Sequence, residues 1–373
     1  MIKILHIARP VGGVGVYIQL LSKFLENEKF SNILICNKKE KIIPIKNNLG
    51  EDIEKYHVNL KREINPFKDL QCLKEIIRIV KDKKPDVIHC HSAKSGILGR
   101  LAGAYLGVPT LYTPHAYSYL STDSIVKRNI YMLIEKVFKF LPSKTLCCSK
   151  SEEYRTIYDL GFDTKKVLLW NNCIEDISHK VSNTFDCKLP KNYICTIGRP
   201  SYQKNTELLI NTLFEIKKEK KDIHLVILGV GLYSPSLDAV KKLIEQKSLN
   251  DNVTLIEWID REDALDILKK SNLYISTSRY EGLPYAVIEA LALGKPCIVT
   301  DVDGNKDLVE NEFNGFIVKE NVQEIAKQTM ILIEDENKMK IMGNNSYLLF
   351  QEKFSIIQNI ELLEKIYTKI KKS

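Results

Sequence analysis

The sequence lacks any apolar run near the roughly 18 residues that a membrane-spanning helix needs. Residues 1–7 form a short strand-like segment without the cleavage pattern of a signal peptide, so we expect a cytoplasmic protein. The nine cysteines include no C-x-x-C pair, which argues against a zinc site or a disulfide framework and favours buried thiols. At 373 residues the chain exceeds what one hydrophobic core usually serves, which favours two domains.

A dinucleotide-binding fingerprint is also missing. The glycine-rich turn 9–15 lies between a predicted strand, 2–7, and a predicted helix, 14–25, but its G-G-x-G spacing is not G-x-G-x-x-G. The next strand, 33–36, ends without an acidic residue. An NAD-dependent oxidoreductase is therefore a weak alternative, although the turn still predicts close approach of the backbone to a ligand.

Charge is distributed unevenly along the chain. Residues 1–170 contain 28 Lys and Arg against 17 Asp and Glu, whereas the remainder contains 27 against 30. The basic first half favours an anionic partner, either an anionic membrane surface or an acceptor that carries pyrophosphate. No basic-aromatic motif for nucleic acid appears. A solvated lysine-rich face is the simpler alternative.

Strands alternate with helices through both halves, a pattern that predicts two doubly wound parallel sheets of the α/β class. We expect a first domain over 1–170 and a second over 171–349, joined by the polar stretch that begins at 171. The last helix, 350–373, is amphipathic, and we expect it to pack against the first domain. A peripheral membrane helix is the competing interpretation.

The segment Glu281–Glu289 places two glutamates at the start of a predicted helix, where Pro284 fits the first turn. Backbone N–H groups between Gly282 and Tyr285 are suited to receive an anion. Carboxylates beside an anion site suggest a ligand that also carries hydroxyl groups. A nucleotide sugar meets both requirements; two solvated glutamates on an amphipathic helix are the alternative.

Two cations and one histidine occupy comparable loops. Arg199 and Lys204 flank the loop between a predicted strand, 193–197, and a predicted helix, 206–217, which outlines a phosphate clamp. His115 lies at the carboxyl end of a predicted strand, 110–115, on the sheet edge where open α/β proteins bind ligands. A structural role for this lone histidine is equally consistent with the sequence.

His89 and His91 share one face of the predicted strand 85–91, so a metal pair is conceivable. The sequence offers no third ligand nearby, whereas metal sites use three or four. We therefore predict no metal site here.

Together these motifs resemble family 4 of the retaining glycosyltransferases, which have the GT-B fold of two Rossmann-like domains that face each other across a cleft. The resemblance covers nearly the whole chain. It is carried by the glycines at 12, 13 and 15, by 86–91 with 99–102, by 113–115, by Gly198-Arg199 with Lys204-Asn205, by 228–231 and by the Glu281–Glu289 pair.

The resemblance implies specific roles. Arg199 and Lys204 would bind the donor diphosphate, Glu289 the ribose hydroxyls and Glu281 the transferred sugar, with His115 near the sugar ring. The residues implied in catalysis are His115, Arg199, Lys204 and Glu281. The residues implied in donor binding are Gly13, Arg199, Lys204, Ile259, Glu281, Gly282, Leu283, Pro284, Tyr285 and Glu289. Such enzymes need no cofactor and no bound metal, and no catalytic base is assigned.

The implied activity is transfer of a hexose or N-acetylhexosamine, with retention, from a UDP-sugar to a saccharide or lipid-linked saccharide. The setting would be synthesis of a bacterial surface polysaccharide (capsule, O-antigen or exopolysaccharide) at the inner face of the membrane. A UDP-sugar epimerase or hydrolase of the same fold and a non-catalytic nucleotide-sugar-binding subunit are the alternatives. The sequence departs from the family at Ala116 and Trp258, where many relatives have glycine.

Overall fold

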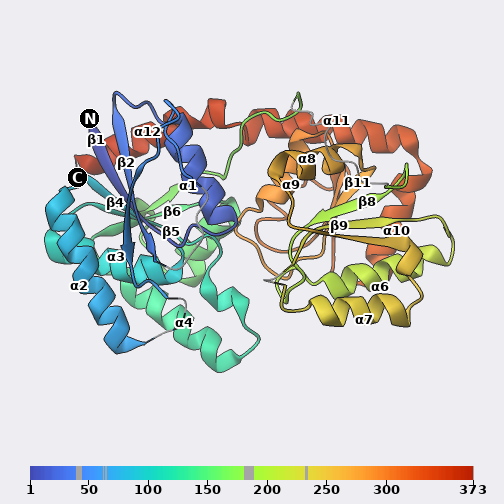
Figure 1. Cartoon of the computed structure of the whole chain (residues 1–373), viewed down its shortest axis with the longest axis horizontal. Helices are drawn as coiled ribbons and strands as arrows, with labels where there is room; N and C mark the ends of the chain where they lie inside the picture. Colours follow the sequence, from blue (N-terminus) through green and yellow to red (C-terminus); the bar gives the residue numbers. More distant parts are fainter. Residues whose placement is uncertain (39–43, 62, 64, 180–188, 232–233, 373) are drawn as a thin grey trace. The chain divides into compact units, whose positions relative to one another are not determined.

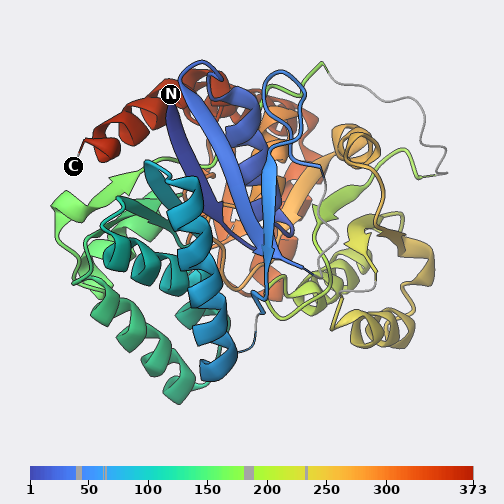
Figure 2. The same ribbon diagram turned by 60° about the vertical axis from the view of Figure 1, so that its left-hand side comes forward.

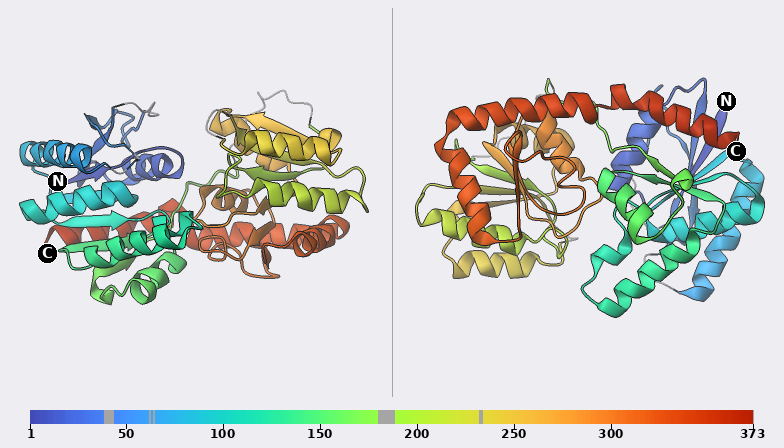
Figure 3. Two further views of the ribbon diagram at one scale, coloured as in Figure 1. Left: turned by 90° about the horizontal axis from the view of Figure 1, so that it is seen from below. Right: turned by 180° about the vertical axis from the view of Figure 1, so that it is seen from behind.

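The computed structural model describes residues 1–38, 44–61, 63, 65–179, 189–231 and 234–372. It divides the chain into two compact units of similar size. Unit 1 contains Met1–Asn172 and Ile356–Ser373, and unit 2 contains Cys173–Ser355. Each unit is built around one parallel sheet with helices on both faces (Figures 1 and 3). Two Rossmann-like α/β units are therefore confirmed.

Unit 1 contains a seven-stranded sheet in the order β3-β2-β1-β4-β5-β6-β7. Its strands are β1 (Ile2–Ile7), β2 (Phe30–Asn37), β3 (Glu54–Val58), β4 (Val87–His91), β5 (Thr110–Thr113), β6 (Ser143–Cys147) and β7 (Val167–Leu169). Its helices are α1 (Gly13–Phe24), α2 (Pro66–Lys83), α3 (Ala93–Leu106), α4 (Ile125–Phe138), α5 (Lys150–Tyr154) and α12 (Ile356–Lys371). Every pair of neighbouring strands is parallel.

The two faces of this sheet differ in chemistry because alternate side chains of a strand point to opposite faces. On β4, Ile88 and Cys90 join the apolar core under α2 and α3. Gly99 allows α3 to lie close to that face, since a Cβ at this position would be 2.1 Å from the Cys90 sulfur. His89 and His91 therefore point to the other face, which α1 and α12 cover.

Unit 2 contains a six-stranded parallel sheet in the order β10-β9-β8-β11-β12-β13. Its strands are β8 (Ile194–Ile197), β9 (Leu225–Val230), β10 (Val253–Glu257), β11 (Leu273–Ser276), β12 (Cys297–Thr300) and β13 (Gly315–Val318). Its helices are α6 (Thr206–Lys217), α7 (Leu237–Gln246), α8 (Arg261–Lys270), α9 (Tyr285–Ala292), α10 (Val322–Glu334) and α11 (Glu336–Lys353). Apolar residues of β8, β9 and β11 form the centre of its core.

The strand orders of the two sheets are equivalent. In each, the first strand of the unit lies between the second and the fourth, so the chain reverses its direction of travel across the sheet at β1/β4 and at β8/β11. The carboxyl ends of strands at such a switch point are the usual ligand site of an open α/β sheet. The switch points of the two units thus lie at equivalent positions in their sheets.

The end of the chain differs from the predicted helix 350–373. One helix, α11, ends at Lys353 inside unit 2, and a second, α12, starts at Ile356 and belongs to unit 1. The break falls at Phe354 and Ser355, where Phe354 is buried and its carbonyl accepts a hydrogen bond from Ile174 N–H. Residues 350–355 therefore pack with unit 2.

Most of the apolar side of the last helix is covered within unit 1, whereas Ile357 and Leu362 remain exposed, so its peripheral membrane role stays a prediction. Leu363, Ile366, Tyr367 and Ile370 of α12 are buried, and α12 contacts α1, β1 and β4 within unit 1 (Figure 2 shows α12 in red). No helix among the described residues is long and apolar enough to cross a bilayer. The eight cysteines in the described part of the chain are buried and free, and Cys187 lies outside it.

Candidate active site

The switch point of unit 2 brings two predicted site loops together. Because β8 and β11 are parallel neighbours, the loop after β8 and the loop after β11 leave the same edge of the sheet. A small hollow at this edge is lined by residues from both, including Gly198, Lys204 and Ser278. Two predicted site residues, Lys204 and Glu281, lie in contact here.

Glu281 is held by three donors. Lys204 Nζ lies 2.7 Å from its Oε1, Ser278 Oγ donates to the same oxygen at 2.8 Å, and Gln203 Nε2 donates to Oε2 at 3.2 Å. Glu281 is only 7% exposed, and burial of a carboxylate is costly unless partners such as these satisfy its oxygens. The Lys204 ammonium carries further N–H donors that remain suited to a second anionic ligand.

The second glutamate has a cation of its own, which the sequence did not suggest. Arg261, at the start of α8, donates to Glu289 Oε1 from Nε at 3.0 Å and from Nη2 at 2.7 Å. Glu289 is 8% exposed on the inner side of α9. Nothing in the spacing predicts this pair, because the two residues are 28 positions apart and a complete strand and the start of another helix lie between them. Arg261 is therefore the main candidate for a functional side chain that the sequence did not reveal.

The loop after β12 packs closely against the loop between Glu281 and α9. A Cβ added to Gly304 would be 2.5 Å from the Gly282 carbonyl oxygen and 3.1 Å from Leu283 N, so only glycine fits against this backbone. Thr300 Oγ1 donates to the Ser278 carbonyl at 2.6 Å. Pro284 precedes the first helical residue, Tyr285, with an extended ψ of 122°. Pro284 was predicted inside the first turn and is instead the N-cap.

The remaining donor-side residues are more exposed. Arg199 is exposed and makes no ion pair with any residue that the structure describes. Ile259 is half-buried in the loop after β10, beside Trp258, which is 73% exposed. A D-x-D run, 301–303, follows β12; its Asp303 carboxylate lies 3.5 Å from Lys306 Nζ. The donor-side residues thus combine two fixed ion pairs with one uncommitted cation.

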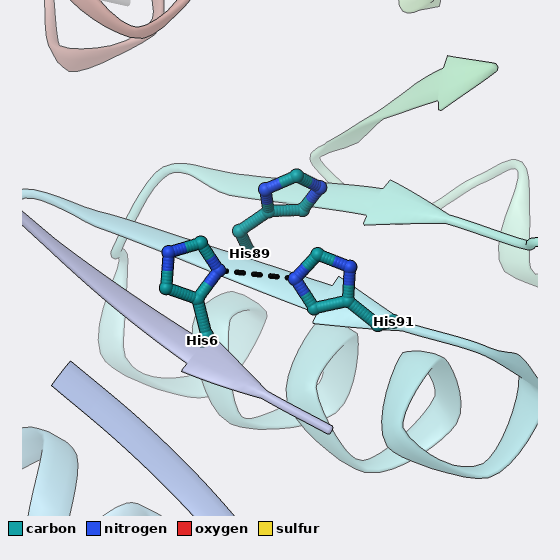
Figure 4. Close-up of side chains that lie close together, drawn as sticks. All are labelled: His6, His89 and His91. Atoms are coloured by element: carbon teal, nitrogen blue, oxygen red, sulfur yellow. Dashed lines mark hydrogen bonds between the residues drawn. The ribbon is translucent and has the colours of Figure 1, made fainter. Parts of the chain in front are cut away.

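The switch point of unit 1 carries a cluster of histidines. His6 on β1 is directly opposite His89 on β4 in the register of the sheet. One ring nitrogen from each of His6, His89 and His91 lies within 4.8 Å of the other two, and the three side chains are fully buried (Figure 4). The Tyr17 ring of α1 meets the His115 ring edge-on at 4.8 Å.

The rings form a continuous hydrogen-bonded chain. His115 Nε2 lies 3.1 Å from His91 Nδ1, His91 Nε2 lies 3.0 Å from His6 Nδ1, and His6 Nε2 lies 3.1 Å from Asn32 Oδ1. Burial lowers the pKa of His6 to about 4 and that of His115 to about 3. Burial also holds the pKa of His91 well below its ordinary value, so all three rings are neutral at pH 7.

Because the rings are neutral, the hydrogen bonds along the row of histidines all run in one direction. A neutral imidazole has a single N–H, so each ring that donates on one side must accept on the other. If Asn32 Oδ1 accepts from His6, then His91 donates to His6, and His115 donates to His91 through Nε2. The Nδ1 of His115 is then an acceptor. An amide of β2 thereby sets which nitrogen of His115 is protonated.

The histidine cluster has three potential metal ligands, one more than the sequence suggested. Every ring nitrogen of the three already faces a partner, because His89 bonds the Tyr367 hydroxyl at 2.7 Å and Thr113 Oγ1 at 2.8 Å. A metal ion at this cluster would have to displace these hydrogen bonds, because each ring nitrogen is already used. The donor set therefore fits a histidine network better than a metal centre.

The loop after β5 is in a conformation that side chains rarely adopt. His115 has φ of 53° and Ala116 has φ of 76°, both in the left-handed region. The buried Glu152 holds this loop, since its carboxylate accepts from Ala116 N–H and from Cys148 N–H, each at 2.9 Å. This explains the glycine expected at position 116 in the family. Gly13, the other predicted residue of unit 1, is exposed as the first residue of α1.

Two protein-family models match the chain. One, described as Glycosyltransferase Family 4, matches residues 11–176, and the other, described as Glycosyl transferases group 1, matches residues 181–349. Together they cover most of the sequence, with their boundary close to that between units 1 and 2.

Curated relatives are similar over nearly the whole chain. An Escherichia coli protein named UDP-Gal:alpha-D-GlcNAc-diphosphoundecaprenol alpha-1,3-galactosyltransferase is 27% identical over 98% of this chain and 96% of its own. The Staphylococcus aureus capsular polysaccharide biosynthesis glycosyltransferase CapM is 27% identical over 90% of this chain and 92% of its own.

Solved structures of GT-B proteins have the same fold. Sucrose-phosphate synthase from Thermosynechococcus elongatus superposes with a TM-score of 0.84 at 18% identity, covering 99% of both chains. The Anabaena protein HepE, solved in complex with UDP-glucose, superposes with a TM-score of 0.82 at 17% identity, covering 99% of this chain and 100% of its own.

Proposed function

The chain belongs to glycosyltransferase family 4, and on that premise we propose that it moves a hexose or N-acetylhexosamine from a UDP-sugar to a saccharide acceptor, with retention of configuration. The observation that carries the proposal is the Lys204–Glu281 pair beside the start of α9. A cation, a carboxylate and a helix N-terminus at one sheet edge match a ligand with a diphosphate and hydroxyl groups.

The donor diphosphate would bind between Lys204, Arg199 and the first turn of α9. The first N–H groups of a helix have no acceptor within that helix, and they point outward along the positive end of its dipole. As the bond between sugar and phosphate breaks, negative charge grows on the leaving diphosphate. Lys204 and Arg199 would stabilise that charge from fixed positions, which lowers the barrier without reorganisation.

The two glutamates would orient the donor through its hydroxyl groups. Glu281 would accept from the transferred sugar and Glu289 from the ribose, while Ile259 would contact the base. Each carboxylate is already held in place by a cation, and its oxygens are suited to accept hydrogen bonds from hydroxyl groups. Neither glutamate is assigned as a base.

Retention without a protein nucleophile is proposed to proceed by attack on the same face of the sugar that the diphosphate leaves. The leaving phosphate oxygen would accept the proton of the attacking hydroxyl, and the new glycosidic bond would form as the bond to phosphate breaks. The neutral His115 would contact the sugar ring, and Gly13 would allow the backbone of α1 to approach the phosphates. His115 would position the sugar and would not carry charge.

The acceptor is proposed to be a saccharide linked to a polyprenyl diphosphate, used at the inner face of the membrane for a capsule, an O-antigen or an exopolysaccharide. The relatives named for a diphosphoundecaprenol acceptor and for capsule synthesis support this assignment. The excess of basic residues in the first half of the chain is consistent with an anionic lipid or pyrophosphate partner.

The deciding experiment incubates the protein with a panel of UDP- and GDP-sugars, with and without extracted lipid-linked saccharides. Release of nucleotide only when an acceptor is present, with an α-linked product from an α-linked donor by NMR, supports the proposal. Turnover without acceptor indicates the epimerase or hydrolase alternative. Binding without any turnover indicates a non-catalytic subunit. Activity that EDTA abolishes and Mg²⁺ or Mn²⁺ restores would contradict the metal-independent mechanism and would direct attention to Asp301 and Asp303.

Binding is measured in parallel by calorimetry with UDP. Lys204→Ala and Glu281→Ala are each expected to weaken it. The matched control is Lys218→Ala, which removes a Lys–Glu pair of similar length, 2.6 Å, from the surface of α6. Equal affinity of all three variants would contradict the assigned site.

A further inference from the structure

Helix α4 carries a row of apolar side chains that nothing in the described structure covers. Val126, Ile130, Leu133 and Val137 recur at alternating spacings of four and three residues, which places them on one face of the helix. Their exposed fractions are 68%, 50%, 62% and 55%. Ile125 at 75% and Phe140 at 78% extend the row at its two ends. We call these six residues the α4 stripe.

The exposed charges on α4 itself are of one sign, and the nearest exposed carboxylate in sequence, Asp123, precedes the helix. Lys127, Arg128 and Lys136 are exposed on the same helix. The single acidic residue of α4 is Glu135, which is 2% exposed and points inward. The solvent-facing side of α4 therefore presents apolar and cationic groups without a helix carboxylate to offset them.

Glu135 fixes the helix to the domain. Its carboxylate accepts from Arg100 Nη2 at 3.0 Å and from the Tyr112 hydroxyl at 2.9 Å, and all three side chains are buried. Ser124 caps the first turn by accepting from Lys127 N–H. The outward direction of the α4 stripe is thus set by a buried ion pair on the opposite side of the helix. In Figures 1 and 2, α4 is the lowest helix of unit 1.

We propose that α4 is the surface by which this protein docks on an anionic lipid bilayer. The apolar stripe would lie at the boundary between headgroups and acyl chains, and Lys127, Arg128 and Lys136 would face the anionic headgroups. A second copy of the chain is the competing occupant. It is disfavoured because an isologous contact would place these cations against the same cations of the partner. The inference rests on the proposed function in one respect, that the acceptor is carried by a lipid.

The test uses the full-length protein and vesicles without donor or acceptor, so that its outcome is independent of catalysis. Vesicles of phosphatidylcholine alone are compared with vesicles that also contain phosphatidylglycerol. The test variant is Ile130→Ser with Leu133→Ser. The matched control is Ile341→Ser with Leu348→Ser on α11, where the native side chains are 61% and 57% exposed.

We expect the native protein and the control to cosediment with the anionic vesicles, and the test variant to bind at least about tenfold more weakly. A Lys127→Glu, Lys136→Glu variant is expected to lose a similar factor, and high salt should weaken native binding. Turnover of a short-chain, water-soluble acceptor should be equal in all variants. Turnover of a vesicle-borne acceptor should fall with binding.

Three results would overturn the assignment. The first is equal binding of test and control variants, and the second is absence of native binding to anionic vesicles. The third is a native dimer in lipid-free solution that the test variant converts to monomer, which would assign the α4 stripe to a second copy. If instead no variant turns over any acceptor while vesicle binding follows the expected order, the proposed function fails and the docking surface stands.

Discussion

The two switch points of this protein occupy equivalent places in equivalent sheets, yet they are built from opposite chemistry. Between β8 and β11, unit 2 holds Glu281 against Lys204, with Glu289 against Arg261 nearby. Between β1 and β4, unit 1 holds His6, His89 and His91, all neutral and fully buried. One site is organised by ion pairs at the rim of the sheet, and the other by hydrogen bonds inside it.

The difference shows what each site can tolerate. Lys204 is 25% exposed, so its charge is partly solvated and can be shared with an incoming diphosphate. In unit 1 a charge would be buried without a counter-ion, so the imidazoles remain uncharged. What they contribute is a fixed direction of hydrogen bonding from ring to ring. We therefore expect unit 2 to respond to loss of charge and unit 1 to respond to gain of charge.

Removal of charge from unit 2 should have the largest effect. Lys204→Met keeps the apolar stem of the side chain but leaves Glu281 without its cation and the leaving diphosphate without a fixed donor. Turnover should fall by roughly 10²–10³-fold, about 3–4 kcal/mol, since a preorganised donor to developing charge is usually worth that much. Steady-state kinetics measure it, with Lys218→Met as control. A loss below about threefold, within the usual scatter of such variants, would contradict the role of Lys204.

Acid should destabilise unit 1 more than unit 2. Burial lowers the folded pKa of His6 from 6.5 to about 4, so the unfolded chain binds the proton first as pH falls. The stability from His6 is therefore complete above pH 6.5 and is lost toward pH 4, by about 3 kcal/mol. Hydrogen exchange at several pH values, corrected for intrinsic rates, should show unit 1 losing protection first.

His6→Gln is the variant that isolates this effect. It should flatten the pH dependence of unit 1, because the glutamine keeps a polar partner for His91 but cannot be protonated. Equal loss of protection in both units between pH 7 and pH 5 would show that the histidine network is not the acid-sensitive element.

Much of unit 2 could be predicted from the sequence, because its site lies on loops that directly follow strands of the sheet. Lys204 and Glu281 follow neighbouring strands, and the order of strands alone brings them to one edge. The contact between Arg261 and Glu289 depends instead on how two helices pack, which no spacing shows. His6 was missed for a related reason, since only the register of β1 against β4 places it opposite His89.

The support beneath the Glu281 loop offers the next test. In Gly304→Ala the new Cβ would meet the Gly282 carbonyl oxygen at 2.5 Å, and the φ of 76° adds strain. We expect about 2 kcal/mol of destabilisation and a weaker affinity for UDP. Gly50→Ala is the matched control, because its φ is 81° but nothing lies within 4 Å of the added atom. Equal losses in the two variants would mean that strain alone, and not contact with the Glu281 loop, determines the effect.

The direction of the hydrogen-bonded histidine chain can be released from its far end, at Asn32. Asn32→Leu removes the acceptor of His6, so His115 is no longer restricted to one tautomer, whereas Asn32→Asp keeps an acceptor in place. We expect about a tenfold loss of turnover in the leucine variant, equivalent to about 1.4 kcal/mol. Imidazole ¹⁵N shifts should show protonated Nε2 of His115 in the native protein and a mixture in Asn32→Leu. Unchanged shifts would contradict the coupling between Asn32 and His115.

The smallest effect tests the loop that carries His115. Ala116 has a φ of 76°, which costs an alanine about 1 kcal/mol or more and a glycine almost nothing. Ala116→Gly keeps the N–H that bonds Glu152 but gains freedom in the unfolded chain, so the net stabilisation should be about 0.5–1 kcal/mol. Ala104→Gly, inside α3, should destabilise by about 1 kcal/mol, because its backbone is helical. Thermal or urea unfolding measures both, and the opposite signs of the two changes are decisive. If Ala116→Gly destabilises as much as Ala104→Gly, the left-handed loop is not strained, and the departure from glycine at this position has no cost to the fold.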